Sequence, residues 1–372
     1  MPMNRRERLT AIFAGQTPDR PAVKLWRAAP EQQLPHPDYE PVYRAAIERT
    51  GLMGGAGSPF DLYNGQFRDE HIHVHEQLTD SPEWVDIVTT LWTPSGELRR
   101  IDRRSTCNRP GYHMEFLLKE PADIKKLLSL PYAPYPFDAG PMVDMECRIG
   151  NAGITLFNLD HAMYGLQRLI GSQNFALWHI SDPDLLLEAI SIFAGRIRQH
   201  AEAAVKAGLT AYFGWVGPEL CIPPLMSPAD FDVYVSAFDK PLIDFIHNAG
   251  GRVWVHSHGK MGPVLERFID MGADVLNPVE APPMGDITLS EAFARTQGRM
   301  ALEGNIQMHD MMTAEPDRLE TLIHAAIDAG RGERFILCPT SSYMETPEPP
   351  PRLIENLLLY VNEGVRYAEE AH

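Results

Sequence analysis

From about residue 180 onward, the chain repeats one pattern of apolar and polar positions. An amphipathic stretch ends at a glycine, and a short run of apolar, often β-branched residues follows. Several of these stretches open with Ser or Thr close to a proline, which suits the first turn of a helix, and glycine suits the position after the last turn. The alternation of helices with buried strands predicts a parallel sheet.

Eight strands are needed to close such a sheet into a barrel, and most of them can be found. Helices are predicted to begin at Ser181, Ser227 and Thr313, with another over residues 261–271. The predicted strands are residues 22–26, 154–157, 209–215, 252–256, 273–277, 299–303 and 335–338, with one more near residue 50. The fold class predicted is therefore α/β, a (β/α)8 TIM barrel. An open dinucleotide-binding sheet is the second choice, because no Gly-x-Gly-x-x-Gly opens a helix here.

Residues 60–150 interrupt the pattern. Residues 71–75, 87–92 and 97–101 alternate like antiparallel strands, with a turn at Ser95-Gly96. The proline-rich residues 131–141 are expected to lead back into the barrel. The prediction is one TIM-barrel domain over residues 1–372, decorated by a hairpin-containing insertion over residues 60–150.

Composition and charge narrow the function. The 372 residues carry a net charge of -17, which argues against nucleic acid as a partner because phosphate contacts need clustered Lys and Arg. No apolar run approaches the roughly 20 residues of a membrane-spanning helix, and the first residues lack the apolar stretch of a signal peptide. The four cysteines share no short spacing that would indicate a disulfide framework. A cytoplasmic protein without membrane contact is expected.

Four residues with metal-binding side chains follow predicted strands in the last third of the chain. They are His256, His258, Glu280 and Cys338. Side chains two apart on a strand point to the same face, and in TIM barrels the C-terminal strand ends carry the chemistry. Two imidazoles, a carboxylate and a thiolate are ligand types that zinc accepts. The pattern predicts a zinc site at the mouth of the barrel.

This prediction has alternatives. Asp274 and Asp286 flank Glu280, and either could take its place. Each of the four residues could also be structural, since a lone Cys is usually a small buried apolar residue. A second histidine cluster, His71, His73 and His75, is interpreted as the polar face of an edge strand in preference to a second metal site.

Other candidates lie at or near strand ends. Asn305 and Glu219 are candidates for catalytic roles, although a turn residue and a solvated rim residue are the plainer interpretations. The candidate substrate-binding residues are Trp26, Asn158, His161, Trp215 and Tyr343. Their aromatic members suit a flat substrate, and burial in the core is the competing interpretation.

Several short motifs together resemble one known group of proteins. They are Arg5-Arg-Glu-Arg8, Asp19-Arg-Pro21, Lys119-Glu-Pro-Ala-Asp123, Leu225-Met-Ser-Pro228, His256-Ser-His-Gly259, Gly272-Ala-Asp274 and Gly304-Asn305. Over nearly all of its length the chain resembles the uroporphyrinogen decarboxylase-like superfamily, which includes corrinoid-dependent methyltransferases and, more distantly, cobalamin-independent methionine synthase. The resemblance implies a (β/α)8 barrel.

The resemblance also implies a zinc site, because the methyltransferase branch holds zinc with a His-x-Cys pair, a later Cys and, in the methionine synthase, a Glu. His256, Glu280 and Cys338 match this pattern, whereas His258 stands where it has Cys. The decarboxylases themselves carry an N-terminal Arg-rich run. Residues 24–30 here read Lys-Leu-Trp-Arg-Ala-Ala-Pro, which is poorly equipped for a substrate with many carboxylates.

The main hypothesis is a zinc-dependent methyltransferase that moves a methyl group between a small molecule and a corrinoid protein. With His258 in place of a thiolate, the ligand set balances the charge of zinc, and such an ion should be electrophilic enough to polarise an ether oxygen. A methyl ether is therefore favoured over a thiol. The alternatives are a cofactor-free decarboxylase of a smaller acid, with Lys24 and Arg27 holding the carboxylate, and a non-catalytic metal-binding relative.

Overall fold

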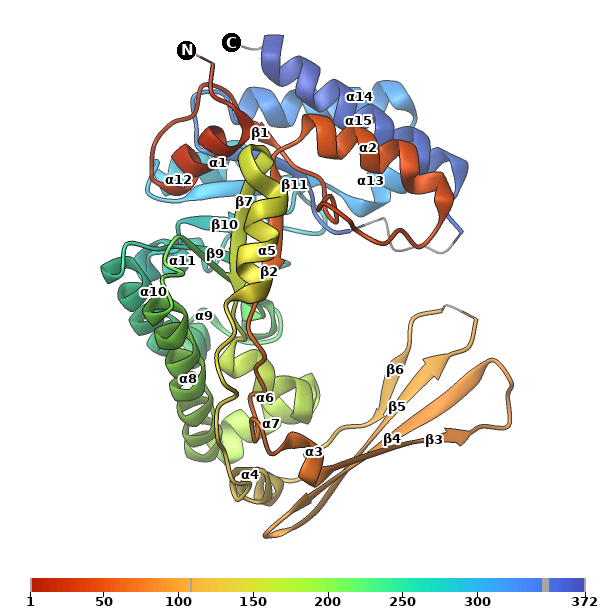
Figure 1. The fold of residues 1–372 in the computed structure, drawn as a ribbon, viewed down its shortest axis with the longest axis vertical. Coiled ribbons are helices and arrows are strands. Elements are labelled where there is room, and N and C mark those ends of the chain that lie inside the picture. Colours follow the sequence, from red (N-terminus) through yellow and green to blue (C-terminus); the bar gives the residue numbers. More distant parts are fainter. Residues whose placement is uncertain (1, 108, 343–347, 371–372) are drawn as a thin grey trace. The chain divides into compact units, whose positions relative to one another are not determined.

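The computed structural model describes residues 2–107, 109–342 and 348–370. Its main sheet has eight parallel strands in the order β1-β12-β11-β10-β9-β8-β7-β2 (Figure 1). Next to the edge strand β2, the backbone N–H of Gly51 donates to the carbonyl of Val23 in the other edge strand, β1, at 2.8 Å. The (β/α)8 TIM-barrel-like fold is thus confirmed, and the open dinucleotide-binding sheet is wrong. The strands are β1 Ala22–Val23, β2 Leu52–Ala56, β7 Gly153–Asn158, β8 Tyr212–Val216, β9 Arg252–His256, β10 Val275–Asn277, β11 Ala301–Ile306 and β12 Phe335–Pro339.

The helices alternate with these strands as the pattern predicts. They are α1 Arg5–Phe13, α2 Glu40–Arg49, α5 Gly140–Ile149, α6 Ala162–Ile170, α7 Ser172–Ser181, α8 Pro183–Lys206, α9 Pro228–Phe231, α10 Ala237–Asn248, α11 Leu265–Met271, α12 Leu289–Thr296, α13 Met308–Thr313, α14 Pro316–Ala329 and α15 Pro351–Glu370. Ser227 caps α9 as expected, and its hydroxyl accepts from the N–H of Asp230. No helix in the described parts of the chain has the length and apolar character needed to cross a membrane.

Two helix starts were predicted wrongly. Ser181 is the last residue of α7, and α8 begins two positions later at Pro183. Thr313 does not open a helix, because it is the last residue of α13 and its hydroxyl donates to the carbonyl of His309. Helix α14 begins at Pro316, with Glu315 in the N-cap position. A proline with fixed φ and no N–H suits the first helical position, and here it outweighs the capping preference of the earlier threonine.

Helix α1 supplies part of the barrel core. Its residues Leu9, Ile12 and Phe13 are buried and pack against residues that the strands turn inward. The strand residues of this cluster are Ala22, Ile154, Leu156, Trp254, Val275, Ala301 and Ile336. Because side chains two apart on a strand point the same way, the next inward positions above this cluster form the floor of the barrel mouth.

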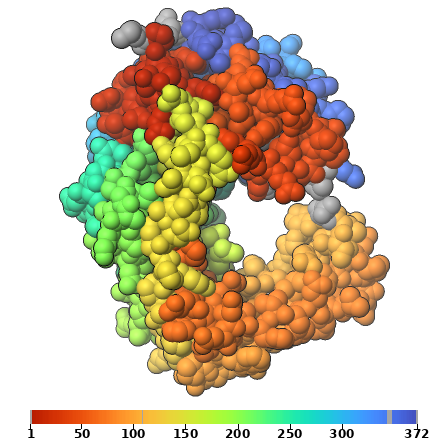
Figure 2. Space-filling view, in the orientation of Figure 1, coloured from red at the N-terminus to blue at the C-terminus, as the bar shows by residue number. Residues whose placement is uncertain are grey.

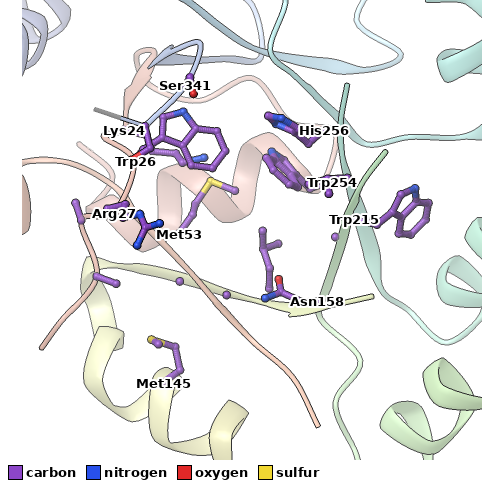
Figure 3. Close-up of a pocket in the computed structure, with 18 of the residues that line it drawn as sticks. Lys24, Trp26, Arg27, Met53, Met145, Asn158, Trp215, Trp254, His256 and Ser341 are labelled. Carbon is purple, nitrogen blue, oxygen red and sulfur yellow. The ribbon is translucent and has the colours of Figure 1, made fainter. Parts of the chain in front are cut away.

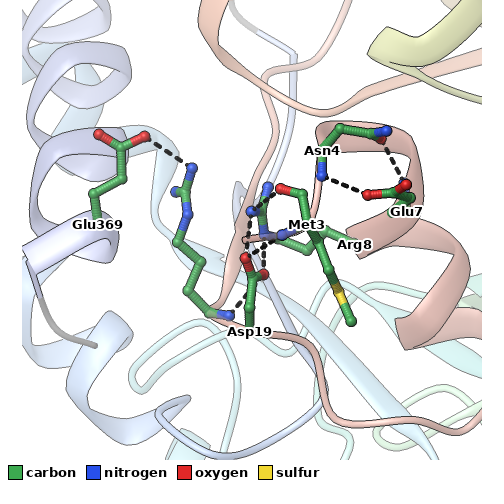
Figure 4. Close-up of polar contacts among 7 residues, drawn as sticks. Met3, Asn4, Glu7, Arg8, Asp19 and Glu369 are labelled. Carbon is green, nitrogen blue, oxygen red and sulfur yellow. Dashed lines mark hydrogen bonds and ion pairs between the residues drawn. The ribbon is translucent and has the colours of Figure 1, made fainter. Parts of the chain in front are cut away.

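A polar anchor fixes α1 to the segment that leads into β1 (Figure 4). Arg8 is buried, and its guanidinium donates to both carboxylate oxygens of Asp19, at 2.7 and 2.9 Å. The backbone N–H of Met3 donates to the same carboxylate at 2.8 Å. Burial raises the pKa of Asp19, but the hydrogen bonds from Arg8 and Met3 outweigh it and lower the pKa overall. Two of the family-like motifs, at residues 5–8 and 19–21, therefore have a structural role.

By its internal contacts the chain forms two compact units. Met1–Ser58, Ala139–Leu159 and Val205–His372 make up the first unit, which holds all eight strands of the barrel sheet. Pro59–Asp138 and Asp160–Ala204 make up the second. The predicted hairpin is confirmed as the strands β4 and β5, which pair as far as Thr93 and Gly96, and it is part of a four-stranded antiparallel sheet in the order β3-β4-β5-β6. The elements of the second unit include α3 Arg68–His71, β3 Ile72–Leu78, β4 Trp84–Thr93, β5 Gly96–Ser105, β6 Tyr112–Glu115 and α4 Pro121–Leu128.

The second unit should respond to acid through His200. The ring of Phe60 lies 4.6 Å from the imidazole, and burial lowers the pKa of His200 from 6.5 to about 4. The unfolded chain then binds this proton more readily than the folded chain. The stability that the neutral imidazole of His200 contributes is fully present above pH 6.5 and is lost as the pH falls toward 4.

Between pH 6.5 and pH 4, the free energy of unfolding of a His200→Phe variant should therefore fall by about 1–3 kcal/mol less than that of the unchanged protein. Denaturant unfolding at a series of pH values measures this difference. Above pH 7 the difference between the two proteins should no longer depend on pH. Parallel curves down to pH 4 would show that the imidazole is not shielded from solvent.

Candidate functional site

A pocket of about 780 Å³ opens at the C-terminal ends of the barrel strands (Figure 3). Its aromatic lining comes from Trp26, which follows β1, and from Trp254 of β9, whose rings lie 6.1 Å apart at 67°. Two thioethers, those of Met53 and Met145, line it as well. The indole of Trp254 packs closely against Gly214 on β8, because a Cβ at this glycine would lie 3.1 Å from the indole. The polar side chains in the lining include Lys24, Arg27, Asn158, His256 and His258.

A buried ion pair forms the floor of this pocket. The ammonium of Lys24 donates to Glu303 Oε1 at 2.6 Å, and both side chains are almost completely buried. The second carboxylate oxygen of Glu303 accepts from Trp254 Nε1 at 2.8 Å. Lys24 Nζ also lies 4.0 Å from the centre of the Trp26 ring. Burial lowers the pKa of Lys24, but the charge of Glu303 more than offsets this, so the pKa is raised and Lys24 stays protonated.

His256 is held as a neutral imidazole beside the two indoles. Its Nδ1–H donates to the side-chain oxygen of Asn277 at 2.6 Å, which leaves Nε2 as the ring atom with a lone pair. Burial is the main cause that lowers the pKa of His256 to about 4, and neighbouring His258 adds to it. The ring lies 5.7 Å from that of Trp26. At neutral pH this side chain can accept a hydrogen bond or coordinate an ion.

His258 and Glu280 form a second polar pair at the barrel mouth. His258 Nδ1 lies 3.4 Å from Glu280 Oε1, and the N–H of Gly259 donates to Glu280 Oε2 at 2.7 Å. Burial raises the pKa of Glu280, but the contacts with His258 and Gly259 lower it below its ordinary value overall. The pair also lines a second, more apolar cavity of about 740 Å³, together with the exposed Met284 and Met308. His258 therefore belongs to the walls of both cavities.

The predicted zinc ligands are only partly brought together. The rings of His256 and His258 lie 4.6 Å apart, and Glu280 is next to them. Cys338 is fully buried beside Lys24 and Glu303, and burial raises the pKa of its thiol well above the ordinary value. Among the described residues, no three His, Cys, Asp or Glu side chains are grouped so that they could hold a metal ion. As they are placed here, the four side chains do not fit a zinc site, and zinc binding stays a prediction.

The other predicted site residues have different surroundings. Trp26 and Asn158 line the main pocket, and Glu219 lines the second cavity. Asn305 lies on β11 directly opposite Cys338 of β12, and neither is among the residues that line the two cavities.

The remaining predicted substrate-binding residues are Trp215, His161 and Tyr343. Trp215 contributes to the pocket wall, but its indole is directed away from the other tryptophans (Figure 3) and donates to Asp239 of α10 at 3.1 Å. His161 belongs to the second unit, where its Nδ1 accepts from the N–H of Tyr164 at the start of α6. Tyr343 lies outside the described residues.

Three residues of the site went unnoticed in the sequence. Trp254 lies two positions before His256 and so faces the same way, and strand alternation alone indicates this. Glu303 is the one charged residue in the apolar run of residues 300–304, which marks it as a buried ionisable group with a partner. Asn277 ends β10 directly opposite His256, and only the strand register reveals that contact.

The comparisons with known proteins agree with the barrel. The sequence model described as Uroporphyrinogen decarboxylase (URO-D) matches residues 166–361. No curated protein matches the chain in sequence. Among solved structures, a methyltransferase from Methanosarcina mazei has a TM-score of 0.60 at 17% identity, and the match covers 99% of each chain. An intracellular xylanase from Thermoanaerobacterium saccharolyticum has a TM-score of 0.33 at 9% identity over 56% of this chain and 72% of its own, too low to support an argument.

Proposed function

This chain belongs to the uroporphyrinogen decarboxylase family, and from that premise we propose that it is a methyltransferase. It would move a methyl group between a small molecule, preferably a methyl ether, and a corrinoid carried by a partner protein. Supporting the proposal are the methyltransferase with the same fold over its full length and the family-like motifs of the sequence. The observation that carries it is the chemistry of the main pocket.

The pocket suits a flat, largely apolar molecule. Its walls offer two indoles and two thioethers, which pack against an aromatic ring. The charge of Lys24 is already balanced by Glu303, so the floor has no excess of cations for a substrate with many carboxylates. The porphyrinogen reaction for which the family is named is therefore a poor fit to this pocket.

Lys24 presents the ammonium end of a neutral ion pair to the pocket, because Lys24 lines the pocket and Glu303 does not. A corrinoid of a partner protein would supply the nucleophile that takes the methyl group of an ether, and the electron pair of the broken O–CH3 bond would stay on the oxygen. A protonated Lys24 at the floor stabilises this developing negative charge, and burial makes such an interaction stronger than it is in water. Glu303 keeps the ammonium charged and in place.

The direct test is a cobalt spectrum. We expect that the purified protein, mixed with a Co(I) corrinoid protein and a panel of methyl donors, produces methyl-Co(III) with methoxyaromatic compounds. Thiols and methylated amines serve as competing donors or acceptors in the same panel. Rapid methylation of thiols without any signal from methoxyaromatics would contradict the proposed substrate class.

The second candidate is decarboxylation of a smaller acid without a cofactor. Lys24 and Arg27 both line the pocket, as this alternative requires. However, neutralisation of Lys24 by Glu303 weakens its case as a carboxylate-binding residue. Release of CO2 from aromatic or short-chain acids, in the absence of any corrinoid, would favour the decarboxylase.

We also propose zinc as the metal of this site, as a prediction with its own test. To hold about one ion per chain, His256, His258, Glu280 and Cys338 would have to come closer together than they lie here, and the ion would then supply a Lewis acid. Elemental analysis should then find zinc in the unchanged protein and little in a His256→Ala/Cys338→Ala variant. The matched control is Cys221→Ala, since Cys221 is also fully buried but lines neither cavity. A fully loaded double variant, or an unchanged protein without zinc, would show the prediction to be wrong.

A further inference from the structure

The two edges of the antiparallel sheet in the second unit differ in a way that points to a partner. At one edge, β6 has four residues, and its pairing with β5 shifts register between Ile101 and Asp102. At the other edge, all seven residues of β3 pair with β4 without a break. Short strands and bulges protect an edge against pairing with another chain, whereas a long regular strand invites it. Strand β3 contains neither proline nor lysine, which are the residues that commonly block such pairing.

Strand β3 is also exposed along its length. Residues 73–78 are all exposed, including two large apolar side chains, Val74 at 53% and Leu78 at 88%. Figure 2, in which this sheet is coloured in shades of orange, shows its side chains at the surface. Within the described residues, β4 is the strand that pairs with β3, so the backbone groups of the outer edge lie open.

The side chains of one sheet face form rows across the strands. Ile72 lies opposite Leu91 of β4, which in turn lies opposite Leu98 of β5, and Leu91 and Leu98 are almost completely buried. At the other end of β3, Leu78 lies opposite the buried Val85. The first row is apolar across all three strands, the second is apolar as far as Val85 and continues into Arg104 of β5, and both stop at the exposed edge. Burial of Leu78 would remove one of the most exposed apolar side chains of the chain from water.

We propose that β3 pairs antiparallel with β3 of a second copy of this chain, about a two-fold axis that passes through His75. This register places Ile72 against Leu78 of the other copy, and Val74 against its Glu76. The apolar row of Leu98, Leu91 and Ile72 then continues into Leu78 and Val85 of the other copy. The result is one eight-stranded sheet with a self-complementary interface.

Neighbouring registers fit less well. An axis through Val74 places Ile72 against Glu76 of the other copy, so that the apolar row meets a carboxylate. An axis through Glu76 opposes Val74 with Leu78, but it also places the two Glu76 carboxylates opposite each other, each paired with Arg104 of its own copy. Like charges in directly opposed positions destabilise a sheet. Of these three axes, the one through His75 opposes Ile72 with Leu78 twice and keeps the two Glu76 carboxylates apart, at the cost of placing Val74 against Glu76. The order of residues along β3 therefore favours a second copy of this strand as the partner, paired in this register.

The first experiment compares two substitutions of Val74 by sedimentation velocity. In the proposed register residue 74 faces Glu76 twice, once from each copy. Val74→Glu creates two repulsive pairs and should weaken dimerisation at least tenfold, whereas Val74→Lys creates two attractive pairs and should preserve the dimer. Ile180→Glu is the matched control, because Ile180 is 79% exposed on α7 of the same unit but outside the sheet. An unchanged protein that stays monomeric, or equal weakening by both Val74 variants, would overturn the proposal.

A cross-link tests the axis itself. In a Cys107→Ser/Cys147→Ser background, which removes the exposed cysteines, His75→Cys should form a disulfide between copies under mild oxidation. His73→Cys should not, because it would face Gln77. A cross-link through residue 73 in place of 75, or a dimer with neither cross-link, would refute this interface. The sheet lines neither of the two barrel cavities, so this outcome is independent of the proposed methyl transfer.

Discussion

Glu303→Gln should lower the free energy of unfolding by about 3–5 kcal/mol, because it leaves a buried ammonium without its counter-ion. The partner, Lys24, is protonated and almost completely buried, and its Nζ lies 2.6 Å from Glu303 Oε1. Glutamine keeps the shape of the side chain but only one acceptor oxygen, so the loss combines the missing charge with the loss of one hydrogen bond, from Lys24 or from Trp254 Nε1. Urea unfolding of the purified variant measures it.

The double variant Lys24→Met/Glu303→Gln separates charge from packing. Removal of both charges should recover most of the lost stability, since replacing a buried pair is often close to neutral. The matched control is Lys240→Met, which breaks an exposed ion pair with Asp244 and should cost less than about 0.5 kcal/mol. A Glu303→Gln variant no less stable than this control would show that Lys24 releases its proton or reaches water.

The same double variant tests the role of Lys24 in the reaction. It should fold, yet form methyl-Co(III) at a rate reduced about 100-fold or more, because it lacks the charge that stabilises the leaving oxygen. A stable double variant with an unchanged rate would remove Lys24 from the proposed mechanism. A loss of stability in Glu303→Gln thus reports the structural role of the ion pair, and a loss of rate in the stable double variant reports a catalytic role of Lys24.

The sequence alone was sufficient for the barrel because its signals are local. Helices that end at glycine and short apolar strands can be recognised within a few residues, and β9 begins and ends as predicted. The observed strand boundaries differ from the predicted ones where apolar and polar residues are interspersed in the sequence. Strand β11 was predicted to end at Glu303, but it extends to Ile306 and so includes Asn305. There the pairing with β12 continues as far as Pro339 and decides the strand's length.

The candidate site was less predictable because its key contacts are distant in sequence. Lys24 and Glu303 are 279 positions apart, and no local pattern joins them. Similarly, Cys338 follows an apolar strand in the way a metal ligand would, yet its inward position brings it to the buried ion pair. Residue types indicated that chemistry lies at the strand ends. The strand register decides which of these side chains meet.

The tryptophans illustrate the same point and lead to the last prediction. Gly214 of β8 lies opposite Trp254 of β9, so the next residue, Trp215, points to the other side of the sheet, toward α10. Trp26 lines the pocket, with its Nε1 donating to the carbonyl of Pro339 at 2.7 Å. Trp26 and Trp254, in place of Trp215, are therefore the residues expected to pack against a substrate ring.

Trp26→Leu should reduce kcat/KM for methoxyaromatic donors by about 10- to 100-fold, mainly by raising KM, because the ring contact is made before and during methyl transfer. Trp215→Leu is the matched control. It removes a buried indole and the hydrogen bond to Asp239, so it should lower stability while leaving KM almost unchanged. Methyl donors without a ring should be less affected by Trp26→Leu than aromatic ones. If Trp215→Leu raised KM as much as Trp26→Leu, the substrate would lie against β8, and the ring-binding role of Trp26 would be wrong.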